Sequence, residues 1–598
     1  MSQKTLSPRK ESDPKYTWKI EDIYMTNEAW QKDFETVSKK LPSLKKFKGT
    51  LTSSAANLLI CLKAINEVSL VIDKLYVYSN MRFHEDSTNA FYQALSEKAE
   101  MLLIRFASET AFITPEIAEL TEAKAKEFLA SDSELNIYSH FILNILRKKD
   151  HTLSPECEEL LAKTGEISEA GQSIFIMLND ADMKFGAIKD ENGEKIELTK
   201  GRYVHFLENA DRRVRKDAFN TLYDAYIRNR NTIAAAYSAS VKKDVFYASA
   251  RKYASSLEMA LADDNIPASV YSSLIDTVHK NIGLMHRYVK IRKKLLNLPK
   301  LHMYDLYAPL VPEAKMVIPF EEAKKTVLSG LKPMGDEYVE ILKKGMEGGW
   351  LDVYENIGKR GGAYSWGTYS VHPFVLLNHN DNINSLFTLA HEMGHALHSY
   401  YSWKEQPYVY SGHKIFVAEV ASTVNEALLM DYMLKNSKDA AEKIYIINYF
   451  LEQFRGTLFR QTMFAEFEKK THELSEAGEI LTCDALSGIY RSLNEFYFGN
   501  DIIIDEKIDM EWARIPHFYN AFYVYQYATG YSAAIAISRM ILDEGAKATK
   551  RYKDFLKKGS AEYSVDLLKG VGVDMSRPEP VENAMRVFES LLDELESI

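Results

Sequence analysis

His391, Glu392 and His395 occur in the spacing His-Glu-x-x-His, which can hold a metal ion. On an α-helix, residues four apart lie one turn above each other, so the two imidazoles project from one face with their Cβ atoms about 5–6 Å apart. Two imidazole nitrogens on that face can reach one Zn²⁺ at about 2.0–2.1 Å. Glu392 is rotated by about 100° around the axis, beside the ion. The spacing predicts a zinc site with Glu392 as the general base for a metal-bound water.

The residues around this motif predict the helix that it needs. Residues 381–385 are rich in helix-capping side chains, and Leu386, Leu389, Met393 and Leu397 follow at helical spacing. The two histidines therefore fall on a face separate from the apolar stripe. The alternative is an ordinary amphipathic helix with surface or core histidines, because a chain of this composition contains the pattern by chance about 3 times in 100.

A catalytic zinc usually takes three protein ligands, so a third one is needed. His398 is about 10 Å from His391 along the helix, which is too far for both to bind one ion. We therefore predict that His398 lies next to the metal ligands without binding the metal itself. Residues 416–430 read as a second helix, with Glu419 and Glu426 on one face. A carboxylate on an apolar helix is costly to bury unless it is paired or bound to metal. We predict Glu419 as the third ligand and Glu426 as the acceptor that orients an imidazole; a solvated or ion-paired Glu426 is the alternative.

These residues resemble the M3 family of zinc oligopeptidases (thimet oligopeptidase-like), in particular its oligoendopeptidase F branch. The likeness extends from Trp18 to beyond Val571, with Met393 in place of the phenylalanine common at that position. Besides the Glu419 helix, the matching blocks are residues 387–399, 359–367, 460–468 and 514–519.

The resemblance implies a fold, a cofactor and a substrate class. The fold would be a mainly α, two-lobed multi-helical zincin metallopeptidase with a deep channel that admits short, unstructured peptides. One Zn²⁺ per chain would be bound by His391, His395 and Glu419, with Glu392 as the base. The implied activity is that of a zinc metalloendopeptidase.

Residues 517–527 carry a histidine and several tyrosines that could donate hydrogen bonds to the oxyanion of a tetrahedral intermediate. If this stretch is helical, Tyr519, Tyr523 and Tyr527 form one ridge, four residues apart. M3 enzymes look similar here, with a histidine followed by tyrosines that contact substrate. We assign His517 and Tyr523 to the oxyanion and Tyr519 and Tyr527 to substrate binding, the alternative being an aromatic core stripe.

Residues 370–378 read as a short strand beside the metal helix, and its proline favours a sheet edge. An open edge could pair with the backbone of an extended peptide. Gly361 and Gly362, just upstream, permit close backbone approach, and we predict that they contact substrate; a plain structural turn is the alternative.

At 598 residues, with 27 glycines and 16 prolines, the chain suits a mainly α protein. Helical periodicity recurs almost throughout, as in Trp30, Phe34, Val37 and Leu41. One β-hairpin is predicted around Asn192-Gly193. We place a loose boundary near residue 200, between an N-terminal helical lobe at residues 1–200 and the catalytic metallopeptidase domain at residues 201–598.

The net charge of -10 argues against nucleic acid as a partner. Three dispersed cysteines, Cys61, Cys157 and Cys483, indicate reduced thiols in a cytoplasmic protein. The N-terminal residues lack a signal peptide's apolar core, and no uninterrupted apolar run approaches about 20 residues, so no membrane association is expected. The sequence gives no indication of the oligomeric state.

Two other functions remain open from the sequence. A carboxypeptidase with the same metal chemistry would need a cation for the terminal carboxylate, and Arg360 or Arg514 could supply it, although a structural ion pair is the simpler reading of each. A non-catalytic peptide-binding or scaffold protein would retain the fold without the chemistry, which intact ligands and base argue against.

Overall fold

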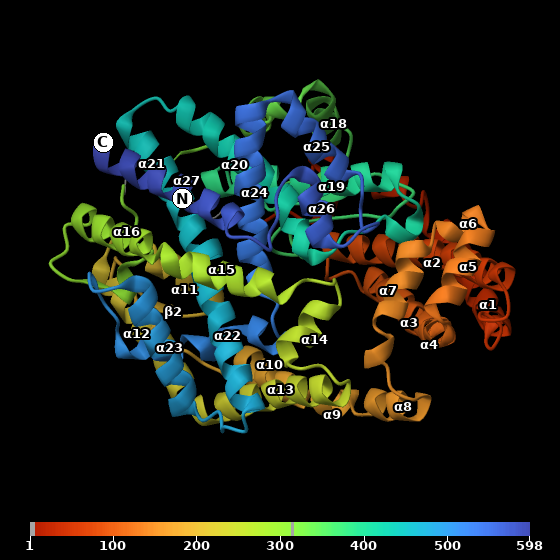
Figure 1. Cartoon of the computed structure of the whole chain (residues 1–598). Coiled ribbons are helices and arrows are strands. Elements are labelled where there is room, and N and C mark those ends of the chain that lie inside the picture. The colour runs from red at the N-terminus through yellow and green to blue at the C-terminus, as the bar shows by residue number, and fades with distance from the viewer. Residues whose placement is uncertain (1–5, 312–315) are drawn as a thin grey trace. The chain divides into compact units, whose positions relative to one another are not determined.

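The computed structural model describes residues 6–311 and 316–598, and it is mainly helical with a few short strands, as predicted (Figure 1). The chain forms two compact units. Unit 1 comprises residues 6–150, 316–432 and 537–572, and unit 2 comprises residues 151–311, 433–536 and 573–598. The predicted division into domains at residues 1–200 and 201–598 stays a prediction.

Unit 1 carries the motif helix and one three-stranded sheet. Its helices are α1 Asn27–Lys40, α2 Ala55–Glu85, α3 Ala90–Thr110, α4 Ile113–Glu119, α5 Glu122–Ser131, α6 Ser133–Asn136, α7 Ser139–Arg147, α17 Phe320–Gly330, α18 Asp336–Glu347, α19 Ile383–Glu405, α20 Ile415–Lys435, α25 Ala546–Leu556 and α26 Ser564–Val571. Its strands are β4 Leu351–Asp352, β5 Tyr364–Trp366 and β6 Phe374–Leu376.

Unit 2 is also helical, with two small two-stranded sheets. Its helices are α8 Pro155–Lys163, α9 Gly165–Ser168, α10 Ala170–Ile176, α11 Lys200–Leu207, α12 Arg212–Arg228, α13 Arg230–Ala250, α14 Ser256–Ala262, α15 Ala268–Lys280, α16 Ile282–Leu295, α21 Ala440–Gln453, α22 Arg460–Glu476, α23 Cys483–Phe498, the start of α24 Tyr525–Glu544, and α27 Glu579–Ser597. Its strands are β1 Ala187–Lys189, β2 Lys195–Glu197, β3 Leu301–His302 and β7 Ile502–Ile503.

The core of unit 1 follows the predicted helical periodicity. Trp30, Val37 and Leu41 are buried, and Phe34 packs against them, because these residues share the inner face of α1 and its continuation. The Trp30 indole N–H donates to the Leu75 carbonyl of α2 at 2.9 Å, which satisfies the one polar atom of a fully buried ring.

Helix α2 is long and apolar enough to cross a membrane by length and composition alone. The core helix of a globular unit has the same properties, and Leu58, Leu62 and Leu75 of α2 are buried in the unit 1 core. The three cysteines Cys61, Cys157 and Cys483 are free thiols, as predicted.

The predicted β-hairpin is confirmed in unit 2. β1 pairs antiparallel with β2, with Ile188 opposite Ile196. Gly193 has a φ of 82°, in the left-handed region, but Asn192 does not, so the turn is the longer hairpin turn with one left-handed glycine and not the two-residue Asn-Gly turn. The Asp190 carboxylate accepts the backbone N–H of Glu194 at 2.7 Å and closes the turn.

The sheet in unit 1 corrects the predicted position of one strand. Its order is β4-β6-β5, so β6, from the segment predicted as an edge, is the central strand. β6 pairs parallel with β4 and antiparallel with β5. The proline that suggested an edge, Pro373, lies just before β6, so its missing N–H costs the sheet no hydrogen bond. β5 is therefore an end strand, and α19 packs against both β5 and β6.

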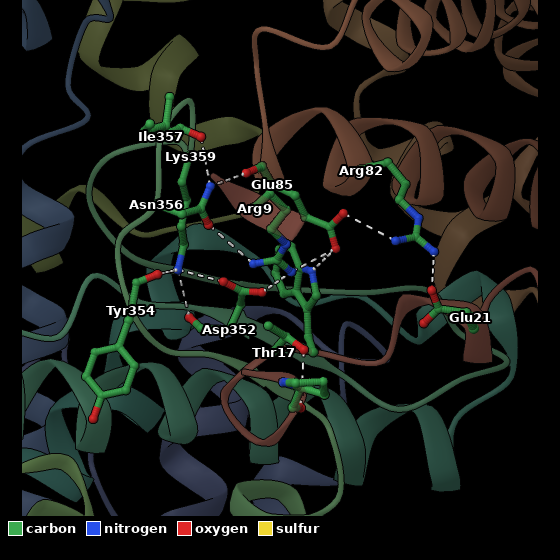
Figure 2. Close-up of polar contacts among 12 residues, drawn as sticks. Arg9, Thr17, Glu21, Arg82, Glu85, Asp352, Tyr354, Asn356, Ile357 and Lys359 are labelled. Atoms are coloured by element: carbon green, nitrogen blue, oxygen red, sulfur yellow. Dashed lines mark hydrogen bonds and ion pairs between the residues drawn. The ribbon is translucent and has the colours of Figure 1, made fainter. Parts of the chain in front are cut away.

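Buried charges fix the segment between β4 and β5 (Figure 2). Arg9 pairs with Asp352 of β4 and, at 3.1 Å, with Glu85 of α2. Lys359, whose side chain is fully buried, lies 2.6 Å from Asp352 and donates to the Tyr354 carbonyl at 2.7 Å. The paired charges satisfy each other away from water and hold residues 352–359 in one conformation.

Candidate metal centre

Helix α19 presents His391 and His395 on one face. Its N-terminus is capped by Asn382, whose side-chain oxygen accepts the Ser385 N–H at 2.9 Å, as the capping residues predict. Gly394, between the histidines, faces α20: a Cβ there would lie 2.6 Å from the Ala421 carbonyl oxygen and 2.7 Å from the Ser422 Cα. The glycine lets α19 and α20 approach closely enough for their side chains to meet.

Three ligand atoms converge where these two helices meet. His391 Nε2 and His395 Nε2 are 3.2 Å apart, and Glu419 Oε2 of α20 lies 3.4 Å from the first and 3.7 Å from the second. Ligand atoms about 2.0–2.1 Å from a tetrahedral zinc lie about 3.3 Å from one another. The donor set and its spacing therefore suit one zinc ion.

Neighbouring polar groups orient these ligands. Glu426 Oε1 lies 2.6 Å from His391 Nδ1. The carboxylate can therefore accept the Nδ1 proton, which leaves Nε2 as the nitrogen available to a metal. The Ser422 hydroxyl donates to Glu419 Oε2 at 3.1 Å. Asn425 links the helices by donating to the Ala390 carbonyl at 3.1 Å.

Glu392 lies beside the three ligand atoms and is 7% exposed. Burial raises the pKa of its carboxyl to about 7, and the charges of Glu419 and Glu426 act in the same direction. The His391 charge and a hydrogen bond from the Ser365 backbone of β5 oppose that rise in pKa. A divalent cation would also favour the ionised form.

His398, predicted near the ligands, is buried one turn further along α19. Its ring stacks on His413 with centroids 4.2 Å apart and packs against Phe555 of α25. Its Nδ1 has no hydrogen-bond partner among the described residues. The structure brings His398 to the same helix face but not into the group of three converging atoms.

The predicted helical ridge of tyrosines in unit 2 is wrong. Residues Pro516–Tyr519 form a short 3-10 helix, and α24 begins only at Tyr525, so no helix runs through residues 517–527. His517, Tyr523 and Tyr527 still gather: ring centroids are 6.1 Å apart for His517 and Tyr523 and 5.5 Å apart for Tyr523 and Tyr527. Tyr519 points elsewhere, stacked on Phe175 at 4.4 Å with a buried hydroxyl.

The bend that gathers these rings depends on a glutamate that sequence reasoning missed. Phe522 has a φ of 56°, a left-handed conformation that costs a non-glycine residue energy. Its N–H donates to Glu468 Oε1 of α22 at 3.0 Å, and its ring packs on His472 with centroids 4.5 Å apart. Burial raises the Glu468 pKa well above its ordinary range, which favours the neutral form of this carboxyl. The available signal was Glu468 next to the apolar residues Phe464, Ala465 and Phe467, at the end of the block at residues 460–468.

Gly361 and Gly362 lie in the loop that leads to β5. Gly362 has a φ of 81°, and added Cβ atoms at both glycines would meet nothing within 4 Å. Asn378 holds the loop by donating to the carbonyls of Arg360 and Gly362 at 3.0 and 2.8 Å. Substrate contact by the two glycines stays a prediction.

Comparison with known proteins decides the family. The family model described as "Peptidase family M3" matches residues 205–587, and that described as "Oligopeptidase F" matches residues 116–185. The chain belongs to peptidase family M3. As a family member it is a metallopeptidase of the oligoendopeptidase F type, as the sequence motifs predicted.

Similar family members cover almost the whole chain. It is 49% identical to oligopeptidase PepF of Bacillus subtilis (strain 168) over 593 residues, which are 99% of this chain and 88% of that protein. It is 39% identical to group B oligopeptidase PepB of Streptococcus agalactiae over 590 residues, 99% of this chain and 98% of that one.

Two solved structures have the same fold. A putative peptidase from Chlamydophila abortus matches with a TM-score of 0.92 and 37% identity, covering 99% of this chain and 100% of that one. Oligoendopeptidase-F from Enterococcus faecium matches with a TM-score of 0.76 and 38% identity over 96% and 99% of the two chains.

The arginines considered for a carboxypeptidase are engaged within this family M3 chain. Arg360 donates to His84 Nε2 at 2.8 Å in unit 1. Arg514 donates to Glu511 at 2.8 Å and to the Tyr223 hydroxyl at 3.3 Å in unit 2. These contacts give both arginines a structural role within their own units.

Proposed function

We propose that this family M3 peptidase is a zinc-dependent endopeptidase that hydrolyses internal bonds of short peptides. The observation that carries the proposal is the convergence of ligand atoms from His391, His395 and Glu419 to within 4.8 Å of one another. One zinc ion per chain held there would act as a Lewis acid on a water and on the scissile carbonyl. A cytoplasmic location stays a prediction.

In this proposal, Glu392 moves the proton. Its buried carboxylate accepts a proton from the water that attacks the scissile carbonyl, and then delivers it to the departing amine. Burial raises the Glu392 pKa and a bound cation would lower it, so the two effects oppose each other at a group that must both take and give a proton. Glu426 keeps the His391 ring in the orientation that leaves Nε2 available.

The end strand β5 offers a place for the peptide backbone. The order β4-β6-β5 leaves one side of β5 without a strand partner among the described residues. An extended peptide paired there would be bound through its main chain, largely independently of its side chains. Gly361 and Gly362, immediately before β5, leave room for such a peptide.

We assign His517 and Tyr523 to the oxyanion. Each offers a polar hydrogen that could be donated to the carbonyl oxygen as negative charge develops on it. Tyr527, whose ring lies beside both, and Tyr519 are the candidates for substrate binding. The packing of Tyr519 against Phe175 makes it the weaker candidate of the two.

The direct test of this mechanism is Glu392→Gln. The amide keeps the size of the side chain but cannot take up the proton, so kcat should fall by at least about 10³-fold, near the contribution of a positioned acid–base. Zinc content should match that of the wild type. Glu405→Gln, an exposed residue at the end of the same helix, is the matched control and should keep full activity. Near-normal hydrolysis by the Glu392 variant would refute the assignment.

The mode of cleavage is tested with modified substrates. Amidation of a peptide's C-terminus removes the carboxylate that a carboxypeptidase must bind, so an endopeptidase keeps cutting the amidated peptide at internal sites, mapped by mass spectrometry. Cleavage of a short peptide but not of a folded protein of the same composition is the expected size dependence.

A further inference from the structure

A small cavity in unit 2 is lined by three arginines. Its volume is about 30 Å³, enough for one or two waters or one small ion. Arg455 comes from the π-helical turn Phe454–Phe459, Arg460 from the start of α22, and Arg514 from the end of the 3-10 helix Glu506–Arg514. Tyr307 and Glu511 also line the cavity, beside Tyr203, Tyr223 and apolar side chains, and we call it the arginine pocket.

The carboxylates at the pocket do not balance these charges. Arg460 and Arg514 share one oxygen of Glu511, at 2.7 and 2.8 Å. The second Glu511 oxygen accepts the Tyr490 hydroxyl at 2.6 Å and so has no further arginine.

A second carboxylate is shared in the same way. Glu452 pairs with Arg455 at 2.6 Å and also with the buried Arg292 at 3.4 Å. In direct ion pairs, four guanidiniums therefore share two carboxylates, although Arg292 lies outside the pocket lining and Glu208 is a further carboxylate near Glu452. Arg455 is only 4% exposed, and a buried excess of charge is costly unless something neutralises it.

Several hydrogen-bond donors at the pocket are free. Among the described residues, no acceptor is found for Nη1 of Arg455, Arg460 or Arg514, or for the Tyr307 hydroxyl. Guanidinium N–H groups are strong donors to anions, and a phenol adds a neutral one.

The pKa of the Tyr307 phenol indicates that the electrostatic potential in the pocket is positive. Burial would raise the pKa of this phenol, but the Arg455 and Arg460 guanidiniums outweigh burial and hold the pKa below its ordinary value. Arg455 lies over the Tyr307 ring at 4.5 Å from its centroid. The environment therefore favours negative charge at this position.

We propose that the arginine pocket binds one small anion, a halide ion or a single carboxylate group. The volume admits an ion of that size, and the unpaired guanidinium N–H groups supply its ligands. Two candidate sources share this chemistry: a free halide, and the carboxylate of a small organic acid. The residues of the pocket belong to unit 2, whereas the three ligand atoms of the candidate metal centre belong to unit 1.

An anion in the pocket would also change the pKa of the His517 imidazole. This consequence rests on the proposed function, in which His517 donates to the oxyanion. Burial lowers the pKa of the His517 imidazole, and the Arg460 charge lowers it further. A bound anion would offset the Arg460 charge. Arg514 lies three residues before His517, so an anion held by Arg514 would also fix the start of that segment.

The test measures anion binding to the full chain without any hydrolysis, so its failure is distinct from failure of the proposed peptidase. Sodium chloride, bromide or formate replaces sodium methanesulfonate, a larger anion without a carboxylate, at constant ionic strength, and Tm is followed. We expect a saturable rise in Tm with the halides, with formate, or with each of them. If both kinds of anion bind, saturating formate should abolish the further rise in Tm on adding chloride. Crystals grown with bromide should give an anomalous peak among the three arginines, unless formate alone stabilises the chain.

Variants make the test specific. Arg460→Gln should weaken anion binding at least about tenfold, because one charge-assisted hydrogen bond is lost. Tyr307→Phe, the milder change, should weaken it by a few fold. Arg287→Gln removes a guanidinium paired at the surface of the same unit with Asp593 and Glu596, and should leave the response unchanged. A Tm independent of all three anions, or a response equal in all variants, would overturn the proposal.

Discussion

At the scale of single residues, the candidate site depends on side chains that hold other side chains. Glu426 fixes His391 through Nδ1, and Ser422 donates to Glu419. Glu468 acts on the backbone, where its carboxyl holds Phe522 in a left-handed conformation next to Tyr523. The Glu468 contact has no sequence pattern, because residues 54 positions apart meet only after folding.

Glu468 gives a residue-scale prediction. In Glu468→Leu the Phe522 N–H loses its acceptor, which costs about 1–3 kcal/mol and releases the bend that presents Tyr523. We expect kcat to fall about tenfold with zinc content unchanged, since 1.4 kcal/mol corresponds to a factor of ten. Glu468→Gln keeps an acceptor oxygen for the Phe522 N–H and, because burial favours the neutral form of the native carboxyl, should stay close to wild type. Equal kcat values for the two variants would remove the proposed role of Glu468.

At the scale of elements, the contact between α19 and α20 brings together the three ligand atoms of the candidate metal centre. The motif helix was predictable because its signals are local: capping residues before it, apolar spacing along it, and histidines four apart. Glu419 was predictable because a carboxylate on an apolar helix needs a partner. The central position of β6 could not be predicted, because it depends on pairing with β4 and β5 and not on the residues of β6 itself.

Gly394 tests this helix contact. In Gly394→Ala the new methyl group would meet backbone atoms of α20 at 2.6–2.7 Å, so the helices must separate. Overpacking of this kind costs about 1–3 kcal/mol, and the displaced Glu419 should lower zinc affinity as well. Gly488→Ala, in the exposed middle of α23 with nothing within 4 Å, is the matched control and should stabilise the chain slightly. Unchanged zinc affinity and Tm in the Gly394 variant would contradict this account of the glycine.

At the scale of the whole molecule, the mainly helical class followed from periodicity and from low glycine and proline content. The ion-pair networks could not be predicted from the sequence, because they join segments that are distant along the chain. In unit 1, Arg9 meets Glu85 and Asp352. In unit 2, Arg460 and Arg514 meet at Glu511, and their excess charge could be counted only once these residues were placed in space.

Glu511 links one such network to acid stability. Burial disfavours its charged form, but the Arg460 and Arg514 guanidiniums outweigh burial and lower the pKa to about 2 from the ordinary 4.5. A lowered folded-state pKa means stabilisation that is present above pH 4.5 and lost as the pH falls toward 2. This shift corresponds to about 3 kcal/mol.

The check is the dependence of Tm on pH. Between pH 4.5 and 2, the decline in Tm should be shallower for Glu511→Gln than for the wild type. Glu473→Gln, which removes an exposed partner of Lys469, is the control and should follow the wild type. Parallel curves for the wild type and the Glu511 variant would show that this carboxylate does not carry the effect.

The most direct test of the central claim is the zinc content of purified Glu419→Ala. The wild type should retain one zinc per chain after dialysis against a weak chelator, as should Glu340→Ala, an exposed residue of α18. The Glu419 variant should keep its helical circular dichroism but lose zinc affinity by more than about 100-fold, beyond the cost of losing an outer hydrogen-bond partner. Unchanged zinc affinity in that variant would contradict the assignment of His391, His395 and Glu419 as the metal ligands.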